Sequence, residues 1–131
     1  MATEFPASRP VEFIASAEDD LAAMPQPVKK IFGFAIFKAE LGDKHPDAKP
    51  LKGFGGAGVL EVVEDYRGDT YRAVYTVKFK GVVYVLDAFQ KKSKKGDATP
   101  KHDMDRVKAR LKLAEQHYKA NYEATQKGRR Q

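Results

Sequence analysis

Three strand-like segments joined by short turns constrain the fold of this chain more than any other feature of its sequence. Apolar and β-branched residues dominate residues 59–66, 71–79 and 82–89. The turn sequence RGDT separates the first two segments, and Gly81 begins the third. Connections this short leave no room for a crossover, so the three strands are predicted to be antiparallel neighbours.

Helical patterns lie on both sides of these strands. Residues 11–15 form a short apolar run after Pro10, which is typical of a first strand. Residues 17–24 carry three acids in their first turn, and a second helix is predicted over 28–41. A final helix over 104–122 has apolar residues at three- and four-residue intervals. This order predicts an α+β fold: a small antiparallel or mixed β-sheet with an N-terminal helical hairpin and a C-terminal amphipathic helix.

The length of 131 residues fits one domain over residues 1–131, with an ordered core over about residues 10–122. The second helix is apolar on more than one side, so it is expected to contact something besides the sheet. Burial inside a small two-layer domain is favoured over contact with a partner chain. The apolar residues that give this pattern are Ile31, Phe32, Phe34, Ile36 and Phe37.

The composition excludes several kinds of protein. The chain has no cysteine and three histidines, so a disulfide framework and a thiolate zinc site are excluded, and no metal or other cofactor is predicted. No apolar run approaches the roughly 18 residues of a membrane span. The N-terminal residues lack the basic and apolar blocks of a secretion signal, and a cytoplasmic location is predicted.

Positive charge is concentrated near the C-terminus. The chain carries 24 Lys and Arg against 18 Asp and Glu, a net charge of +6. Residues 1–86 have a net charge of −1, whereas residues 87–131 have +7. This excess predicts a basic face that attracts nucleic acid, anionic lipid or an acidic protein. Solvated lysines on a helix are the alternative.

Four lysines within five residues follow the last predicted strand, and an arginine occupies the strand before it. A strand that ends in clustered cations delivers positive charge to one place, and phosphate is the expected partner. Arg72 is the first candidate to grip a phosphate, because its guanidinium is a planar donor fork that stays charged. The alternative for Arg72 is a salt bridge to Glu61 or Glu64 across the hairpin. The four lysines are Lys91, Lys92, Lys94 and Lys95.

The stretches LKGFGGAGVLEV, GDTYRAVYTV and VYVLDAFQKKSKKGDATPKHDMDRVKARL resemble the RelE/ParE toxin superfamily, and within it the HigB-like, phage-associated branch. The likeness covers roughly residues 10–120. It implies a cognate antitoxin, with which the chain can form a hetero-oligomer, and no membrane partner. For RelE and HigB members it also implies cleavage of messenger RNA on the ribosome, without a metal.

The resemblance assigns roles to Arg72 and Lys91, and the chemistry of the side chains suggests roles for Glu61 and Tyr75. Arg72 matches the strand arginine of RelE-like ribonucleases, and Lys91 falls at their second catalytic cation. Glu61 is a candidate general base, and Tyr75 could donate a proton or stack on a base, with half-buried packing as its alternative. The remaining candidate RNA contacts are Lys52, Arg67, Lys92, Lys94 and Lys95.

Two departures from the family pattern keep other functions open. The strand that supplies catalytic lysines in RelE reads Leu60, Glu61, Val62 and Val63 here, and Asp87 stands where HigB-like enzymes commonly have a histidine. An acid there is expected to repel RNA. A non-catalytic, ParE-like inhibitor of DNA gyrase or another basic binding protein, and an inactive prophage relic, are therefore the alternatives.

Overall fold

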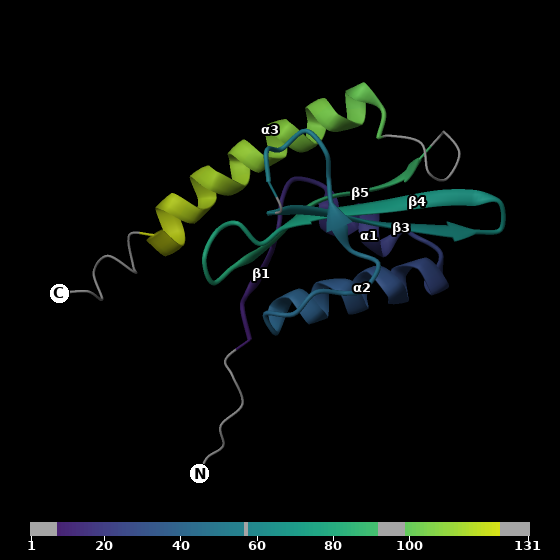
Figure 1. The fold of residues 1–131 in the computed structure, drawn as a ribbon, viewed down its shortest axis with the longest axis horizontal. Helices are drawn as coiled ribbons and strands as arrows, with labels where there is room; N and C mark the ends of the chain where they lie inside the picture. Colours follow the sequence, from purple (N-terminus) through teal and green to yellow (C-terminus); the bar gives the residue numbers. More distant parts are fainter. Residues whose placement is uncertain (1–7, 57, 92–98, 124–131) are drawn as a thin grey trace, which may run out of the picture.

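A five-stranded mixed sheet lies between helices in the computed structural model, which describes residues 8–56, 58–91 and 99–123 (Figure 1). The strand order is β1-β5-β4-β3-β2. The strands β2 to β5 pair antiparallel, whereas β1 pairs parallel to β5. Their bounds are β1 (Val11–Phe13), β2 (Lys49–Pro50), β3 (Val59–Tyr66), β4 (Asp69–Thr76) and β5 (Val83–Lys91).

The helices cover the two faces of the sheet separately. The helices α1 (Ala17–Ala22) and α2 (Gln26–Glu40) follow β1 and form the predicted helical hairpin. The long helix α3 (Lys101–Tyr118), continued by the π-helical segment η1 (Lys119–Glu123), lies on the other side of the sheet from α2 (Figure 1). The parallel pairing of β1 with β5 is possible because two helices and three strands of chain separate them.

Two hydrophobic clusters result from this layering. On the α2 side, Val28 and Phe32 pack with Leu60 and Val85 of the sheet. On the α3 side, a separate cluster forms around Val107. The strands β4 and β5 contribute to both clusters, so their side chains are buried on both faces. The α3-side cluster includes Val59, Val74, Tyr84, Leu86, Val107, Ala114 and Tyr118.

The predicted α+β class and the order of the main elements are confirmed. The second and third central strands are shifted from the prediction, because β4 begins at Asp69 and β5 reaches Lys91. The hairpin between β3 and β4 is a two-residue turn, in which Arg67 and Gly68 have φ angles of 51° and 85°. Two positive φ angles are typical of a type I′ turn, which leaves Asp69 and Thr70 in the strand.

The preferred interpretation of α2 as a helix buried inside a two-layer domain is wrong. Phe34 and Phe37 are 50% and 49% exposed, since only one side of α2 meets the sheet and the loop after α2 covers Phe34 only in part, through His45. The second apolar side of α2 therefore faces outward. In the described part of the chain, no helix has both the length and the apolar character needed to cross a membrane.

Two glycine substitutions test this backbone geometry. Gly68→Ala is expected to lower the free energy of unfolding by about 1–2 kcal/mol, because an alanine is strained at positive φ. Gly33→Ala is expected to raise it by about 1 kcal/mol, because Gly33 lies inside α2 and a Cβ added there would meet open space. Urea unfolding of both variants measures these values. If both variants changed the free energy of unfolding by the same amount in the same direction, the turn assignment would be contradicted.

Candidate functional site

Arg72 and Lys91 lie on the same face of the sheet. In the antiparallel pairing of β4 with β5, Arg72 is opposite Phe89 and Thr70 is opposite Lys91. Side chains two residues apart on a strand share a face, so Lys91, Phe89 and Arg72 all point toward the α3 side. Phe89 packs against the α3-side cluster, which agrees with this assignment. The sheet therefore brings the two predicted cations together.

The guanidinium of Arg72 is held by an acid and a hydroxyl. Its Nη1 donates to Oε2 of Glu61 at 2.5 Å and to Oγ1 of Thr99 at 2.5 Å. Thr99 precedes α3, and its hydroxyl also lies 3.5 Å from the same Glu61 oxygen. Glu61 is thus the cross-strand partner that the sequence offered as one of two alternatives. A buried arginine needs such a partner, because an unpaired charge in the interior is strongly destabilising.

The predicted cations do not line an open hollow. Arg72 and Lys91 are each only 3% exposed, and Glu61 is 6% exposed. The contact between Arg72 and Thr99 shows one reason, since the segment leading into α3 closes over the sheet at this point. The structure thus brings the cations and the candidate base to one face, but in a covered arrangement.

Tyr75 is not part of this constellation. Its side chain belongs to the α2-side cluster, because it lies three positions from Arg72 on β4 and points to the opposite face. Tyr75 is 1% exposed, and burial raises the pKa of its hydroxyl to about 12. The idea that Tyr75 works beside Arg72 is therefore wrong for this arrangement, and packing, its alternative, describes it.

The other predicted RNA contacts are spread over the molecule. Lys52 is exposed in the loop after β2, near the start of β3. Arg67 is exposed in the turn at the other end of β3, and its guanidinium lies 5.2 Å from the ring centre of Tyr66. The turn is near the end of β5, so Arg67 is at the same end of the sheet as Lys91. Lys92, Lys94 and Lys95 lie outside the described residues.

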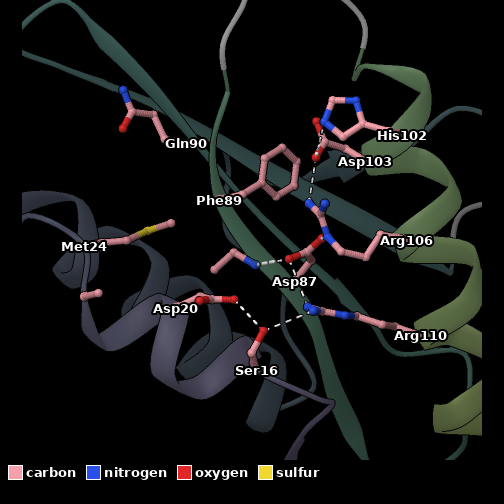
Figure 2. Close-up of a pocket in the computed structure, with 12 residues that line it drawn as sticks. Ser16, Asp20, Met24, Asp87, Phe89, Gln90, His102, Asp103, Arg106 and Arg110 are labelled. Carbon is pink, nitrogen blue, oxygen red and sulfur yellow. Dashed lines mark hydrogen bonds and ion pairs between the residues drawn. The ribbon is translucent and has the colours of Figure 1, made fainter.

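An ionic network that the sequence did not indicate connects α3 to β5. Figure 2 shows Arg106 and Arg110 reaching from α3 to Asp87. Nε of Arg106 donates to Oδ2 of Asp87 at 2.7 Å, and Nη1 of Arg110 donates to Oδ1 at 3.0 Å. Arg106 also binds Asp103 at 2.7 Å. These side chains line part of a cavity of about 540 Å³ between α1, β5 and α3.

Hydrogen bonds and ion pairs in this network offset the energetic cost of burying the charged carboxylate of Asp87. Burial raises the pKa of Asp87, and the two arginines and the N–H of Ala88 lower it in part. Burial also opposes the charge on Arg106, but the hydrogen bonds to Asp87 and Asp103 outweigh it and raise the pKa of Arg106. The pairing with two arginines favours an ionised Asp87 at neutral pH.

The network changes two expectations. Asp87 is 1% exposed and paired, so it is not a free acid that repels RNA. The basic region over residues 87–131 was expected to form a basic face or a solvated helix surface, but Arg106 and Arg110 of this region, four residues apart, point toward the sheet instead. In the sequence, the signal for this network was the presence of two arginines four residues apart on a helix together with an acid inside an apolar strand. The exposed cations that remain on α3 and just after it include Lys108, Lys112 and Lys119.

The histidines on α3 have separate roles. His102 is 77% exposed and its Nε2 lies 3.5 Å from Asp103. His117 is packed, with its Nδ1 2.9 Å from the hydroxyl of Tyr84.

Within residues 8–56, 58–91 and 99–123, no three His, Asp or Glu side chains are grouped so that they could hold a metal ion.

Removal of the Asp87 carboxylate tests the network. Asp87→Asn leaves Arg106 and Arg110 without their buried partner, so it is expected to lower the free energy of unfolding by about 3 kcal/mol. Asp105→Asn is the matched control, because Asp105 pairs with Lys101 on the surface, where solvent screens the pair, and the loss should be far smaller. Chemical denaturation measures both. Similar small losses would show that the network contributes little.

Comparison with known proteins identifies a family. Residues 19–112 match the model of the family described as phage-derived protein Gp49-like. This match confirms the resemblance to the phage-associated branch of the RelE/ParE superfamily. No curated protein sequence is significantly similar to the chain.

Two solved structures are similar to part of this chain. A mutant of the Escherichia coli toxin RelE in the free state is 17% identical, with a TM-score of 0.49, and the match covers 65% of this chain and 85% of that one. The toxin–antitoxin complex RelBE2 from Mycobacterium tuberculosis is 22% identical, with a TM-score of 0.44 and coverage of 66% and 95%. At these values neither structure bears on what the chain does.

Proposed function

This chain belongs to the phage-derived Gp49-like family, and on that premise we propose that it is the toxin of a type II toxin–antitoxin system that cleaves messenger RNA on the ribosome. The observation that supports this proposal most is the placement of Arg72 and Lys91 on one face of the sheet, with the carboxylate of Glu61 bound to Arg72. These are groups that metal-free RNA cleavage requires.

The chemistry follows from these three side chains. The 2′-hydroxyl of the RNA attacks the adjacent phosphorus, and Glu61 takes the hydroxyl proton. The new P–O2′ bond forms as the P–O5′ bond breaks, which leaves a 2′,3′-cyclic phosphate and a 5′-oxygen that takes a proton from water. Arg72 and Lys91 stabilise the negative charge that develops on the phosphate oxygens.

The covered state of these groups implies an opening step. Arg72 is bound to Thr99 at the entrance to α3, so an RNA phosphate reaches it only after this contact is released. The phosphate then replaces the hydroxyl of Thr99, and Glu61 loses part of its hold on Arg72. Cations kept away from water act on a phosphate more strongly than solvated ones, because the local dielectric is low.

Dependence on the ribosome fits this site. Tyr75 faces the opposite side of the sheet, so it does not protonate the leaving oxygen. When the ribosome positions the RNA, orientation lowers part of the barrier, and the chain need not supply a complete acid–base pair. The proposal implies a cytoplasmic location, since messenger RNA on the ribosome is the substrate.

A cognate antitoxin is the expected protein partner. The exposed lysines of α3 are not part of the ionic network and leave positive charge at the surface. An antitoxin that covers them would present acidic residues. Burial of these cations without compensating charge would be costly.

A non-catalytic inhibitor, similar to ParE members that act on DNA gyrase, is the second candidate. One observation favours it: the guanidinium of Arg72 already binds Glu61 in the interior, as expected of a structural ion pair. In that case the exposed lysines of α3, rather than Arg72, would contact the target.

A double substitution separates the candidates. Glu61→Gln with Arg72→Gln removes both charges of the buried pair and leaves amides that can hydrogen-bond to each other, so the fold should persist. Cleavage is expected to fall by about 10²-fold or more, because the phosphate loses a cation and the base is gone. RNA sequencing after induction measures cuts at defined codon positions, and circular dichroism checks folding.

The matched control is Lys101→Gln with Asp105→Asn, which removes an exposed ion pair of the same net charge. It should leave the cuts unchanged. Undiminished cuts in the folded Glu61/Arg72 variant would show that this pair is not catalytic. DNA damage without cuts in the wild type would favour the gyrase inhibitor.

A further inference from the structure

The cavity between α1, β5 and α3 contains a guanidinium that is held from several directions. Nε of Arg106 donates to Asp87 and its Nη2 donates to Asp103, each at 2.7 Å. The Cζ atom of Arg106 also lies over the ring of Phe89, 5.2 Å from the ring centre. Figure 2 shows the guanidinium between the two carboxylates and beside this ring. Two of its three nitrogens are thus bound, and an aromatic ring supports it from one side.

Arg106 is nevertheless partly open to the cavity. Its side chain is 33% exposed, whereas that of Arg110, which binds the same carboxylate of Asp87, is 12% exposed. Arg110 shows that Asp87 can be neutralised by an arginine that is largely covered. A planar cation that is held rigidly and still open on one side is a surface on which a flat ring can stack.

The size and the walls of the cavity suit a flat heterocycle. Its volume of about 540 Å³ is within the range typical of small-molecule sites. Met24 and Phe89 make part of the wall apolar, and Gln90 and His102 add polar groups. A nucleobase matches such a wall, because its faces stack on rings and guanidinium planes while its edge forms hydrogen bonds.

The cavity adjoins the proposed cleavage site. Phe89 is directly opposite Arg72 in the pairing of β4 with β5, and it lies two residues before Lys91 on the same face of the sheet. The Cα atoms of directly opposed residues are about 5 Å apart. An RNA strand whose phosphate reaches Arg72 therefore carries a neighbouring base close to Phe89 and Arg106.

We infer that this cavity binds a nucleobase beside the scissile phosphate, and that the base stacks on the guanidinium of Arg106. The inference rests on the proposed function for the choice of RNA as the ligand, and it adds a site that recognises a base. Purines have the larger ring surface and stack more strongly, so a purine is the expected occupant. Phe89 acts through Arg106, as a positioning residue that supports the guanidinium.

Titration of the full chain with adenosine 5′-monophosphate and with ribose 5-phosphate tests the base site, because only the first ligand carries a base. NMR chemical shifts measure both affinities. The wild type is expected to bind the nucleotide about tenfold more tightly. Arg106→Lys should remove this advantage, because lysine keeps the charge but has no planar group. Arg110→Lys is the matched control, since it makes the same change in the other arginine bound to Asp87 and should keep the advantage.

Substitutions of Phe89 test the same site without changing an ion pair. Phe89→Leu should reduce the advantage of the nucleotide, whereas Phe89→Tyr should retain it, because only the tyrosine still places a ring under the guanidinium. Circular dichroism checks that each variant is folded. Equal affinities of the wild type for the two ligands would overturn the inference, as would a folded Arg106→Lys variant that keeps the full advantage.

RNA sequencing after induction separates this inference from the proposed cleavage. The Arg106→Lys variant should cut with a weaker preference for a purine beside the cut than the wild type does. Cuts by a wild type that shows no advantage for the nucleotide would overturn the base site and leave the cleavage proposal standing. An advantage that depends on Arg106, in a wild type that makes no cuts, would support the base site and contradict cleavage.

Discussion

The burial of β4 and β5 on both faces is the constraint from which the rest of the structure follows. A charged side chain on a strand covered on both sides must find a partner inside the protein, because water cannot reach it. Arg72 on β4 meets this requirement with Glu61 of β3 and Thr99 before α3. Asp87 on β5 meets it with Arg106 and Arg110 of α3. Both solutions involve the segment at or near α3, so the same charges that need partners also hold the helix on the sheet.

This arrangement gives the proposed function a physical form. In the proposed mechanism, the buried Arg72 is oriented by the carboxylate of Glu61 and so is preorganised to bind a phosphate. Its burial also keeps a phosphate from reaching it. Release of the contact with Thr99 opens Arg72 to the phosphate in this mechanism. Asp87 at the middle of β5 binds Arg106 and Arg110 in the body of α3, whereas Thr99 lies before the start of the helix, so the proposed release need not displace α3.

Much of the fold could be predicted from the sequence, because it depends on local patterns. Short turns required antiparallel neighbours, and apolar periodicity marked α2 and α3. The strand ends were less certain, since the positive φ angles of Arg67 and Gly68 decide where the β3–β4 turn closes. The two-residue strand β2 was missed, because Lys49 and Pro50 carry no strand signal and pair only through contact with β3.

The sequence by itself determined the composition of the site: one strand arginine, a lysine at the end of the last strand, and an acid across the hairpin. Only the tertiary structure decided which charges pair and which remain in water, because Asp87 with Arg106, and Arg72 with Thr99, are neighbours through the docking of α3 and not through their spacing along the chain. Desolvation and ion pairing act over a few ångströms in space, and for elements that meet only when α3 docks, the sequence separation does not give that distance.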